Sequence, residues 1–381
     1  MNHIWYHIED KNIKNNEDII VYFSGNIAEV YQLKQWWKVF EALHEVENIR
    51  VVVSSKAVCE YLIRHFSKKN GILITFIKTS IEVLNFYQSI DVKVVLYVNN
   101  NRKNFHSLAY NKALHVHLNH GESEKSSMYS NQSKSYDYTL VVGDAAIDRY
   151  KRHMINIKRA NYEKIGRPQF DHIQNIKKTI DKKVILYAPT DESTHISMRY
   201  TSLEKYGLNI VNSVLSNENY FLVYRPHPRT GKNSDIIKNI NKEIIDIVNS
   251  SDNASLEVEL EALDLLSIVD IAIFDNSSLI IDFLYFNRPM FATDMFIPEY
   301  HNKEEFKMLD GCIMLNDENI NDFRDILEYE INNDSLSEKR AKIKKYYLGD
   351  YKKGESTKIF INKIKDIIKE RDRLIEEKEN I

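Results

Sequence analysis

Residues 268–286 read IVDIAIFDNSSLIIDFLYF, a mostly apolar run followed by a polar tetrapeptide and a second apolar segment. The run Ile268–Phe274 is strand-sized and rich in β-branched residues, which predicts a buried strand. Asp275-Asn276-Ser277-Ser278 then supplies side chains that begin helices, and Ser278–Phe286 continues as a helical segment. A continuous apolar strand that leads into a helix is typical of a parallel sheet covered on both faces.

The same alternation of strand and helix extends toward both ends of the chain. Nearby strand candidates are Val184–Tyr187, Phe221–Tyr224 and Met290–Ala292, with helical segments at Leu203–Leu215 and Glu257–Ser267. An earlier series has further strand candidates, joined by helical stretches such as Tyr31–Val46 and Lys56–Lys69. These strand candidates are Asp18–Phe23, Ile49–Val53, Ile72–Ile77, Val92–Val98, Ala113–Leu118 and Thr139–Val142. The pattern predicts an α/β protein with two parallel sheets.

Two breaks in the pattern place the domain limits. Gly166-Arg167-Pro168 and the polar stretch Gln174–Lys183 separate the two series. We predict a Rossmann-like domain at 1–170, a second at 171–354, and a C-terminal helix at 355–381 that packs one apolar face on a domain. Whether this helix returns to the first domain stays open. We expect the two domains to face each other across a cleft, with a ligand at the carboxyl ends of both sheets.

Composition excludes several classes of protein. The 381 residues carry Lys+Arg 52 against Asp+Glu 55, a formal charge of -3, which argues against nucleic acid as a partner. Cys59 and Cys312 are the only cysteines, too few for a disulfide framework or a zinc ribbon. The polar start lacks a signal-peptide pattern, and no apolar run is long enough to span a membrane, so we expect a cytoplasmic protein. P-loop, GxGxxG and GxSxG motifs are missing.

The first candidate site is His115–Glu122, at the end of a predicted strand. His115 and His117 fall on one face of that strand, and His120 follows it beside Gly121. The three histidines could bind a metal, but catalytic zinc ligands are usually spaced more widely. The two strand histidines are also explained as core residues. His120 is a candidate general base because imidazole titrates near neutral pH.

Two further candidates follow strands of the second series. Arg225-Pro226-His227-Pro228 holds an Arg and a His rigidly, which suits phosphate, although a structural turn explains the prolines equally well. Asp275–Ser278 opens a helix and could bind an anion, or Ser277 and Ser278 could be ordinary caps. Smaller signals are Thr190, after the strand Val184–Tyr187, and Ser356 and Thr357, before the last helix.

The order of these motifs resembles the CDP-glycerol glycerophosphotransferase family of teichoic acid and capsule synthesis. The similarity covers roughly Ala113 to Phe360 and includes His120-Gly121, Gly166–Pro168, Tyr187–Thr190, Arg225–Pro228, Asp275–Ser278 with Asp282, and Gly354–Thr357. The family has the two-domain GT-B architecture. Its pattern commonly continues with Thr-Pro after His-Gly, where Glu122–Lys125 stands here, and has Tyr at Asn276 and Arg at Lys358.

The resemblance implies roles for these residues. His120 and His227 match the family's two catalytic histidines, with Gly121 and Glu122 on the acceptor side. Arg225, Asp275, Asn276, Ser277 and Ser278 match the donor's phosphate-binding region, joined by Thr190, Ser356 and Thr357. No metal site and no cofactor are expected to be required.

The resemblance predicts a transferase that moves glycerol phosphate or ribitol phosphate from a CDP-activated polyol to a polymer hydroxyl and releases CMP. A lipid-linked or phosphate-rich polymer is the expected acceptor, with peripheral contact at the inner face of the membrane through basic or aromatic residues. The alternatives are a nucleotide-sugar glycosyltransferase of the same architecture and a non-catalytic scaffold.

Overall fold

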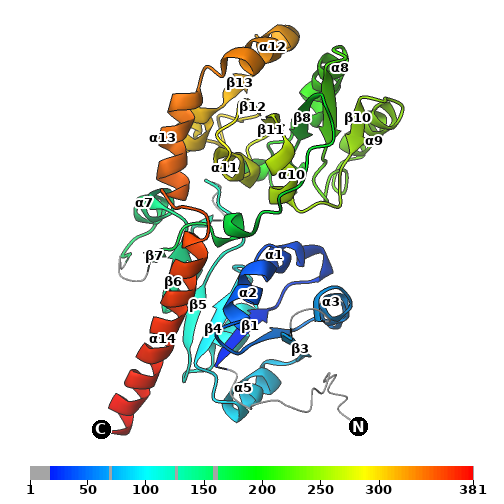
Figure 1. Cartoon of the computed structure of the whole chain (residues 1–381). Coiled ribbons are helices and arrows are strands. Elements are labelled where there is room, and N and C mark those ends of the chain that lie inside the picture. The colour runs from blue at the N-terminus through cyan, green and yellow to red at the C-terminus, as the bar shows by residue number, and fades with distance from the viewer. Residues whose placement is uncertain (1–17, 68–70, 125–127, 158–161, 381) are drawn as a thin grey trace. The chain divides into compact units, whose positions relative to one another are not determined.

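The computed structural model describes residues 18–67, 71–124, 128–157 and 162–380, and these divide into two compact units. The first unit comprises the described residues of Met1–Gly121, Tyr129–His172 and Asp350–Ile381. The second unit comprises those of Glu122–Met128 and Ile173–Gly349. Each unit holds one parallel sheet with helices around it, which confirms the predicted pair of α/β domains (Figure 1).

The first unit is built on a seven-stranded sheet with the order β3-β2-β1-β4-β5-β6-β7. Its strands are β1 Ile19–Phe23, β2 Ile49–Val53, β3 Leu73–Phe76, β4 Val94–Tyr97, β5 Leu114–His117, β6 Tyr138–Val141 and β7 Tyr162–Lys164. Every neighbouring pair is parallel. All six predicted strands are present, and only β7, at the sheet edge, was not predicted.

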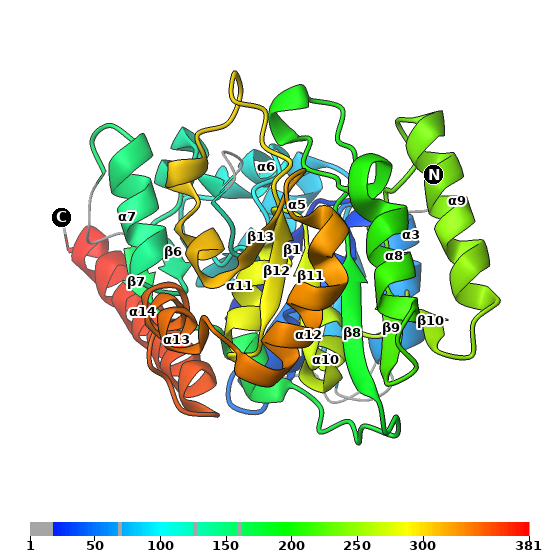
Figure 2. The same ribbon diagram turned by 90° about the horizontal axis from the view of Figure 1, so that it is seen from above.

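The second unit has a six-stranded sheet with the order β10-β9-β8-β11-β12-β13, again parallel throughout. The strands are β8 Lys183–Ala188, β9 Tyr220–Tyr224, β10 Ala254–Leu256, β11 Ile271–Phe274, β12 Met290–Thr293 and β13 Ile313–Leu315. Figure 2 shows them side by side in this order, from right to left. Numbered within each unit, both sheets follow the doubly wound order 3-2-1-4-5-6, whose ligand-binding crevice lies at the carboxyl ends of strands 1 and 4.

The helices lie mainly between successive strands. In the first unit they are α1 Tyr31–Lys34, α2 Trp37–His44, α3 Lys56–Leu62, α5 Ser80–Ser89, α6 Asn104–Leu108, α7 Asp144–His153 and α14 Glu355–Glu379. In the second unit they are α8 Leu208–Leu215, α9 Asp235–Asn249, α10 Ala262–Ile268, α11 Ser278–Leu284, α12 Phe323–Asn333 and α13 Ser337–Leu348. The helix predicted at Glu257–Ser267 begins only at Ala262, and its last residue, Ile268, takes the place where the strand was predicted to start. No described helix is both long enough and apolar enough to cross a membrane.

The C-terminal helix α14 belongs to the first unit. Phe360, Ile364 and Ile367 are completely or almost completely buried in the core formed with β1, β2 and β4. Charged contacts continue the attachment: Lys93 Nζ lies 2.8 Å from Asp372 Oδ2, and Arg371 pairs with Asp91. The return of this helix to the first domain, which the sequence left open, is therefore observed.

Removal of the Ile364 side chain tests how much α14 contributes to the first unit. Ile364→Ala leaves a cavity in a closed core and is expected to lower the free energy of unfolding by about 2–5 kcal/mol. Lys369→Ala, on the exposed side of the same helix, is the matched control and should change it by less than about 0.5 kcal/mol. Denaturant unfolding measures both, and equal effects of the two substitutions would contradict the packing described here.

Candidate functional site

In the second unit, Asp275 ties together the loops at the carboxyl ends of three strands. Its completely buried carboxylate follows β11 and accepts hydrogen bonds from the Thr190 amide (2.7 Å), the Ser202 amide (3.2 Å) and the Thr293 hydroxyl (2.6 Å). Burial raises the pKa of Asp275 to about 6, against the effect of these hydrogen bonds. Thr190 follows β8 and Asp275 follows β11, so this contact spans the switch point of the sheet. The carboxylate of Asp275 thus has an observed structural role. Contact of Asp275 and Thr190 with the phosphate-bearing donor substrate stays a prediction.

The residues after Asp275 present polar atoms without partners. Both side-chain polar atoms of Asn276 and the hydroxyl of Ser277 are enclosed, and within the described part of the chain none has a hydrogen-bond partner. Ser277 has the backbone conformation of an N-cap before α11, yet its side chain makes no capping bond, and Ser278 is the first helical residue. Buried polar atoms normally find partners, so this turn is suited to a ligand that supplies them.

The loop after β9 contains the predicted Arg225 and His227. The Arg225 Nη1 atom is enclosed and has no partner among the described residues; burial lowers the pKa of this side chain, while Glu257 and Glu261 raise it. His227 Nδ1 accepts the Arg229 amide hydrogen at 3.2 Å, so a neutral His227 ring carries its proton on Nε2. The Asp191 carboxylate lies 3.9 Å from the same Nδ1.

Sequence reasoning missed the acidic residues that shape this loop. Glu192 is buried and accepts hydrogen bonds from the amides of Gly231 (3.0 Å) and Asn233 (2.7 Å), which lower its pKa against the raising effect of burial. Asp191 also pairs with Arg229. The only local indication of this role was the pair of acidic residues directly after Thr190. The partners of Glu192 lie 39 and 41 residues further along the chain, so no nearby pattern identifies them.

In the first unit, His120 follows β5, and hydrogen bonds and a ring contact fix its backbone and its side chain. Asn119 adopts a left-handed conformation (φ 59°), and its side-chain oxygen accepts the His120 amide hydrogen at 2.9 Å. The Trp36 indole donates to the Asn119 carbonyl (2.5 Å), and Arg167 Nη1 donates to the His120 carbonyl (3.3 Å). The Tyr31 ring meets the imidazole edge-on, 6.0 Å between centroids.

The surroundings of His120 keep its ring neutral. Burial lowers the pKa of His120 to about 4, and the nearby Arg167 charge lowers it further, while a hydrogen bond with the Val98 backbone acts in the opposite direction. The ring nitrogen Nδ1 is enclosed and has no partner within the residues described. A neutral imidazole with an unused acceptor is the form that a general base requires.

The neighbouring histidines behave as core residues. His115 contacts the Tyr97 hydroxyl and the Tyr110 carbonyl, each at 2.8 Å. His117 stacks on Tyr136, and its burial, together with repulsion from His120 once that ring is protonated in acid, lowers the pKa of His117 to about 3. Among the described residues, no group of three or more His, Cys, Asp or Glu side chains is arranged to hold a metal ion.

Ser356 and Thr357 lie at the start of α14 in the first unit, where the Asp171 carboxylate binds the backbone and the Thr357 side chain. The Asp171 carboxylate accepts the amides of Gly354 (2.6 Å) and Thr357 (2.7 Å) and the Thr357 hydroxyl (2.8 Å). Ser356 is buried. Contact of Ser356 and Thr357 with donor phosphates stays a prediction, and it would require Thr357 to exchange this internal partner. Asp171 itself gave no signal in the sequence.

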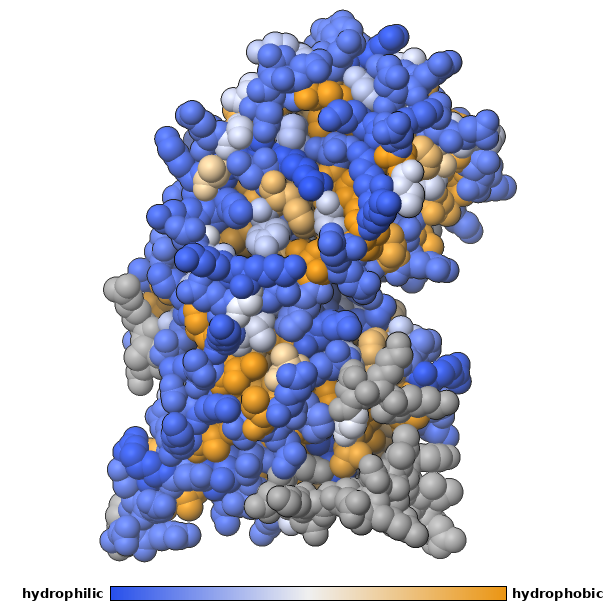
Figure 3. Space-filling view, viewed as in Figure 1, coloured by the Kyte–Doolittle hydropathy of each residue, from blue (hydrophilic) through white to orange (hydrophobic). Residues whose placement is uncertain are grey.

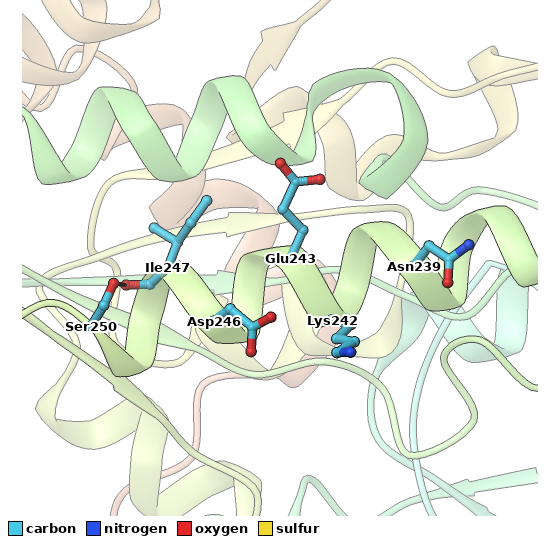
Figure 4. A pocket seen from close by; sticks show the side chains of 6 residues that line it. All are labelled: Asn239, Lys242, Glu243, Asp246, Ile247 and Ser250. Carbon is cyan, nitrogen blue, oxygen red and sulfur yellow. Dashed lines mark hydrogen bonds between the residues drawn. The ribbon is translucent and has the colours of Figure 1, made fainter.

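The other predicted residues lie elsewhere. Gly121 ends the first segment of the first unit, whereas Glu122 is buried and belongs to the second unit. A shallow hollow on the surface of the second unit contains none of the predicted residues. It is lined by α9 and its C-cap, through Asn239, Lys242, Glu243, Asp246, Ile247 and Ser250 (Figure 4).

Two doubly wound parallel sheets, with polar side chains at their carboxyl ends, define a two-domain α/β protein of the GT-B type. A family model described as CDP-Glycerol:Poly(glycerophosphate) glycerophosphotransferase matches residues 2–365. The chain therefore belongs to this family.

Similar proteins agree with the family and the fold. Teichoic acid glycerol-phosphate primase from Bacillus subtilis (strain 168) is 32% identical over 164 residues, which are 41% of this chain and only 39% of that protein. A structure of the wall teichoic acid polymerase TagF soaked with CDPG has a TM-score of 0.62 at 15% identity, covering 94% of this chain and 90% of that one. The co-structure of S. aureus MnaA with UDP has a TM-score of 0.60 at 15% identity, covering 92% and 97%.

Replacement of Asp275 tests whether its carboxylate organises the loops of the second unit. Asp275→Asn exchanges one acceptor oxygen for an NH₂ group that faces backbone donors, and we expect the free energy of unfolding to fall by about 2–4 kcal/mol. Asp317→Asn is the control, because Asp317 pairs with Lys205 at the exposed surface and its replacement should leave the unfolding midpoint close to that of the parent protein. If both variants unfold at the same denaturant concentration as the parent protein, the role assigned to Asp275 is wrong.

Proposed function

We propose that this protein transfers a polyol phosphate, glycerol phosphate or ribitol phosphate, from a CDP-activated donor to a hydroxyl of a teichoic-acid-like or capsular polymer. Membership of the glycerophosphotransferase family supports the reaction class. The observation that carries the proposal is the half-buried, neutral His120 just beyond the carboxyl end of β5, with its enclosed Nδ1 atom. The matched part of the primase covers less than half of either chain, so the choice of polyol and polymer is part of the proposal.

In the proposed reaction, His120 removes the proton of the acceptor hydroxyl. The hydroxyl oxygen forms a bond to the phosphorus that bears the polyol, and the bond from that phosphorus to the bridging oxygen of the diphosphate breaks. The electron pair stays with this oxygen, and CMP leaves. Because the base must be neutral to accept a proton, burial beside Arg167 prepares His120 for this step at neutral pH.

The second unit supplies the groups that would neutralise the donor diphosphate. Arg225 brings a positive charge, and His227 brings a proton on Nε2. Asn276, Ser277 and Ser278 bring the polar turn before α11, in which Asn276 and Ser277 have enclosed polar atoms without partners in the described structure. Preorganised donors of this kind lower the barrier to phosphoryl transfer, and the proposal therefore requires no resident cofactor.

A phosphate-rich or lipid-linked acceptor would bring the protein to the inner face of the cell membrane. The last turn of α7 carries Lys151 and Arg152, and the nearby Ile155 is 88% exposed. Basic side chains around an exposed apolar residue favour contact with anionic lipid. The face of the molecule in Figure 3 is mainly hydrophilic, with small apolar groups between. We propose peripheral contact of a cytoplasmic protein on this basis.

The reaction can be tested by CMP release from CDP-glycerol or CDP-ribitol with a polyol-phosphate primer. His120→Ala should lower kcat by about 10²–10⁴-fold, since the base is lost. The control is His106→Ala, which changes an exposed histidine of α6 in the same unit. An unchanged rate in His120→Ala would overturn the mechanism, and turnover of UDP-sugars instead of CDP-polyols would indicate a glycosyltransferase.

The acidic limb of the pH–rate profile should report the pKa of His120. Because the neutral ring is active, kcat/KM should be retained above pH about 4 and decrease as the pH falls through that value. Arg167→Met removes a charge that lowers this pKa, so the limb should move to higher pH, whereas Arg167→Lys should keep it low. Identical acid limbs in the Met and Lys variants would refute the electrostatic role of Arg167.

A further inference from the structure

His120 lies next to the point where the chain leaves the first unit. That segment of the first unit ends at Gly121, and Glu122–Met128 belongs to the second unit. A single glycine therefore separates the proposed base from residues that pack with the donor-binding domain. Glycine tolerates many backbone conformations, so Gly121 alone does not fix the direction of the chain after His120.

The chain before and at His120 is firmly attached to the first unit. The side chain of Asn119 accepts the His120 amide hydrogen, Trp36 donates to the Asn119 carbonyl, and Arg167 donates to the His120 carbonyl. These contacts fix the backbone on the upstream side. The position of the ring also depends on what holds the chain downstream.

Downstream, the chain is anchored through a buried carboxylate. Glu124 is only 6% exposed, and its Oε1 accepts a hydrogen bond of 2.6 Å from the hydroxyl of Tyr347. Tyr347 lies in α13 and is completely buried. Hydrogen bonds to a carboxylate are short and strong, and a buried carboxylate is costly unless it has such a partner. The contact therefore fixes Glu124 to α13 specifically.

The distance along the chain makes this anchor relevant to His120. Glu124 is the fourth residue after His120 in the sequence, so their Cα atoms are at most about 14 Å apart. If Glu124 moves further than this short segment can extend, either the backbone at Gly121 must rotate or His120 must move as well.

We propose that Glu124 is a positioning residue for His120, and that its hydrogen bond with Tyr347 anchors the downstream end of the His120 loop to α13 of the second unit. Glu124 acts through the backbone and has no part in proton transfer. The catalytic consequence rests on the proposed function, whereas the anchor itself does not.

The kinetic test uses the full-length protein, CDP-glycerol or CDP-ribitol, and a polyol-phosphate primer. Tyr347→Phe removes the donor hydroxyl and should lower kcat by about 10–100-fold, because a small misplacement of a base is costly. The Kd of the CDP-polyol, measured by calorimetry without primer, should change by less than about twofold, since the diphosphate is assigned to other groups of the second unit. Glu124→Gln keeps an acceptor oxygen for Tyr347 and should keep kcat within about twofold.

Two further variants separate the anchor from a general loss of stability. Tyr329→Phe removes an exposed hydroxyl from α12 and should behave like the parent protein. Glu124→Ala should reproduce the kcat of Tyr347→Phe, and the double variant should be no worse than either single one, because both remove the same contact. Additive losses in the double variant, or a parallel loss of donor affinity, would overturn the proposal.

Hydrogen exchange provides a readout that does not depend on activity. In the absence of substrates, Tyr347→Phe and Glu124→Ala should each speed exchange in a peptide that spans residues 117–121 by about tenfold, and Glu124→Gln should not. If the parent protein releases no CMP but these exchange rates change as expected, the proposed function fails and the anchor stands. If exchange at 117–121 is the same in all variants, the anchor is wrong whatever the activity.

Discussion

Every strand pair in both sheets runs parallel, and this constraint decides where the chemistry can lie. Parallel strands need crossover connections, so all carboxyl ends of a sheet share one edge and their loops meet there. In the second unit, the loops after β8 and β11 and the last residue of β12 meet around the buried carboxylate of Asp275. In the first unit, the loops after β5 and β7 meet where Arg167 donates to the His120 carbonyl. The sheet thus brings together residues that are far apart in the chain.

Burial shifts the pKa values of Asp275 and His120 in opposite directions. It raises the pKa of Asp275 to about 6 and lowers the pKa of His120 to about 4, because in each case the charged form loses hydration. For His120 the effect favours the neutral ring, which is the form that the proposed base needs. For Asp275 it is a cost, which the donors from Thr190, Ser202 and Thr293 offset. Burial therefore favours the neutral form of an imidazole that accepts a proton, whereas a buried carboxylate needs several hydrogen-bond donors around it.

The long apolar strands were predictable because they are buried on both faces, and the motifs at their ends could be located for the same reason. Strands β7, β10 and β13 were missed because each has only three residues and lies at a sheet edge, where an apolar run is not needed. Asp171 and Glu192 were missed because each binds amides of a distant segment, which leaves no periodic pattern nearby. A short sequence can show that a turn is polar, but not which remote backbone it will bind.

The segment from Gly166 to His172 has a role that its local sequence did not indicate. Arg167 binds the His120 carbonyl, one residue before the chain leaves the first unit at Gly121, and Asp171 binds the amides at the start of α14, just after the chain returns at Asp350. Gly166 has φ 71°, and a Cβ there would lie 2.2 Å from the Ser356 hydroxyl, so a larger residue would push α14 away. His172 is itself the last residue before another crossing, so this short segment lies next to two points where the chain leaves the first unit and one where it returns. Since Arg167 donates to the His120 carbonyl, this segment helps to fix the backbone at the proposed base.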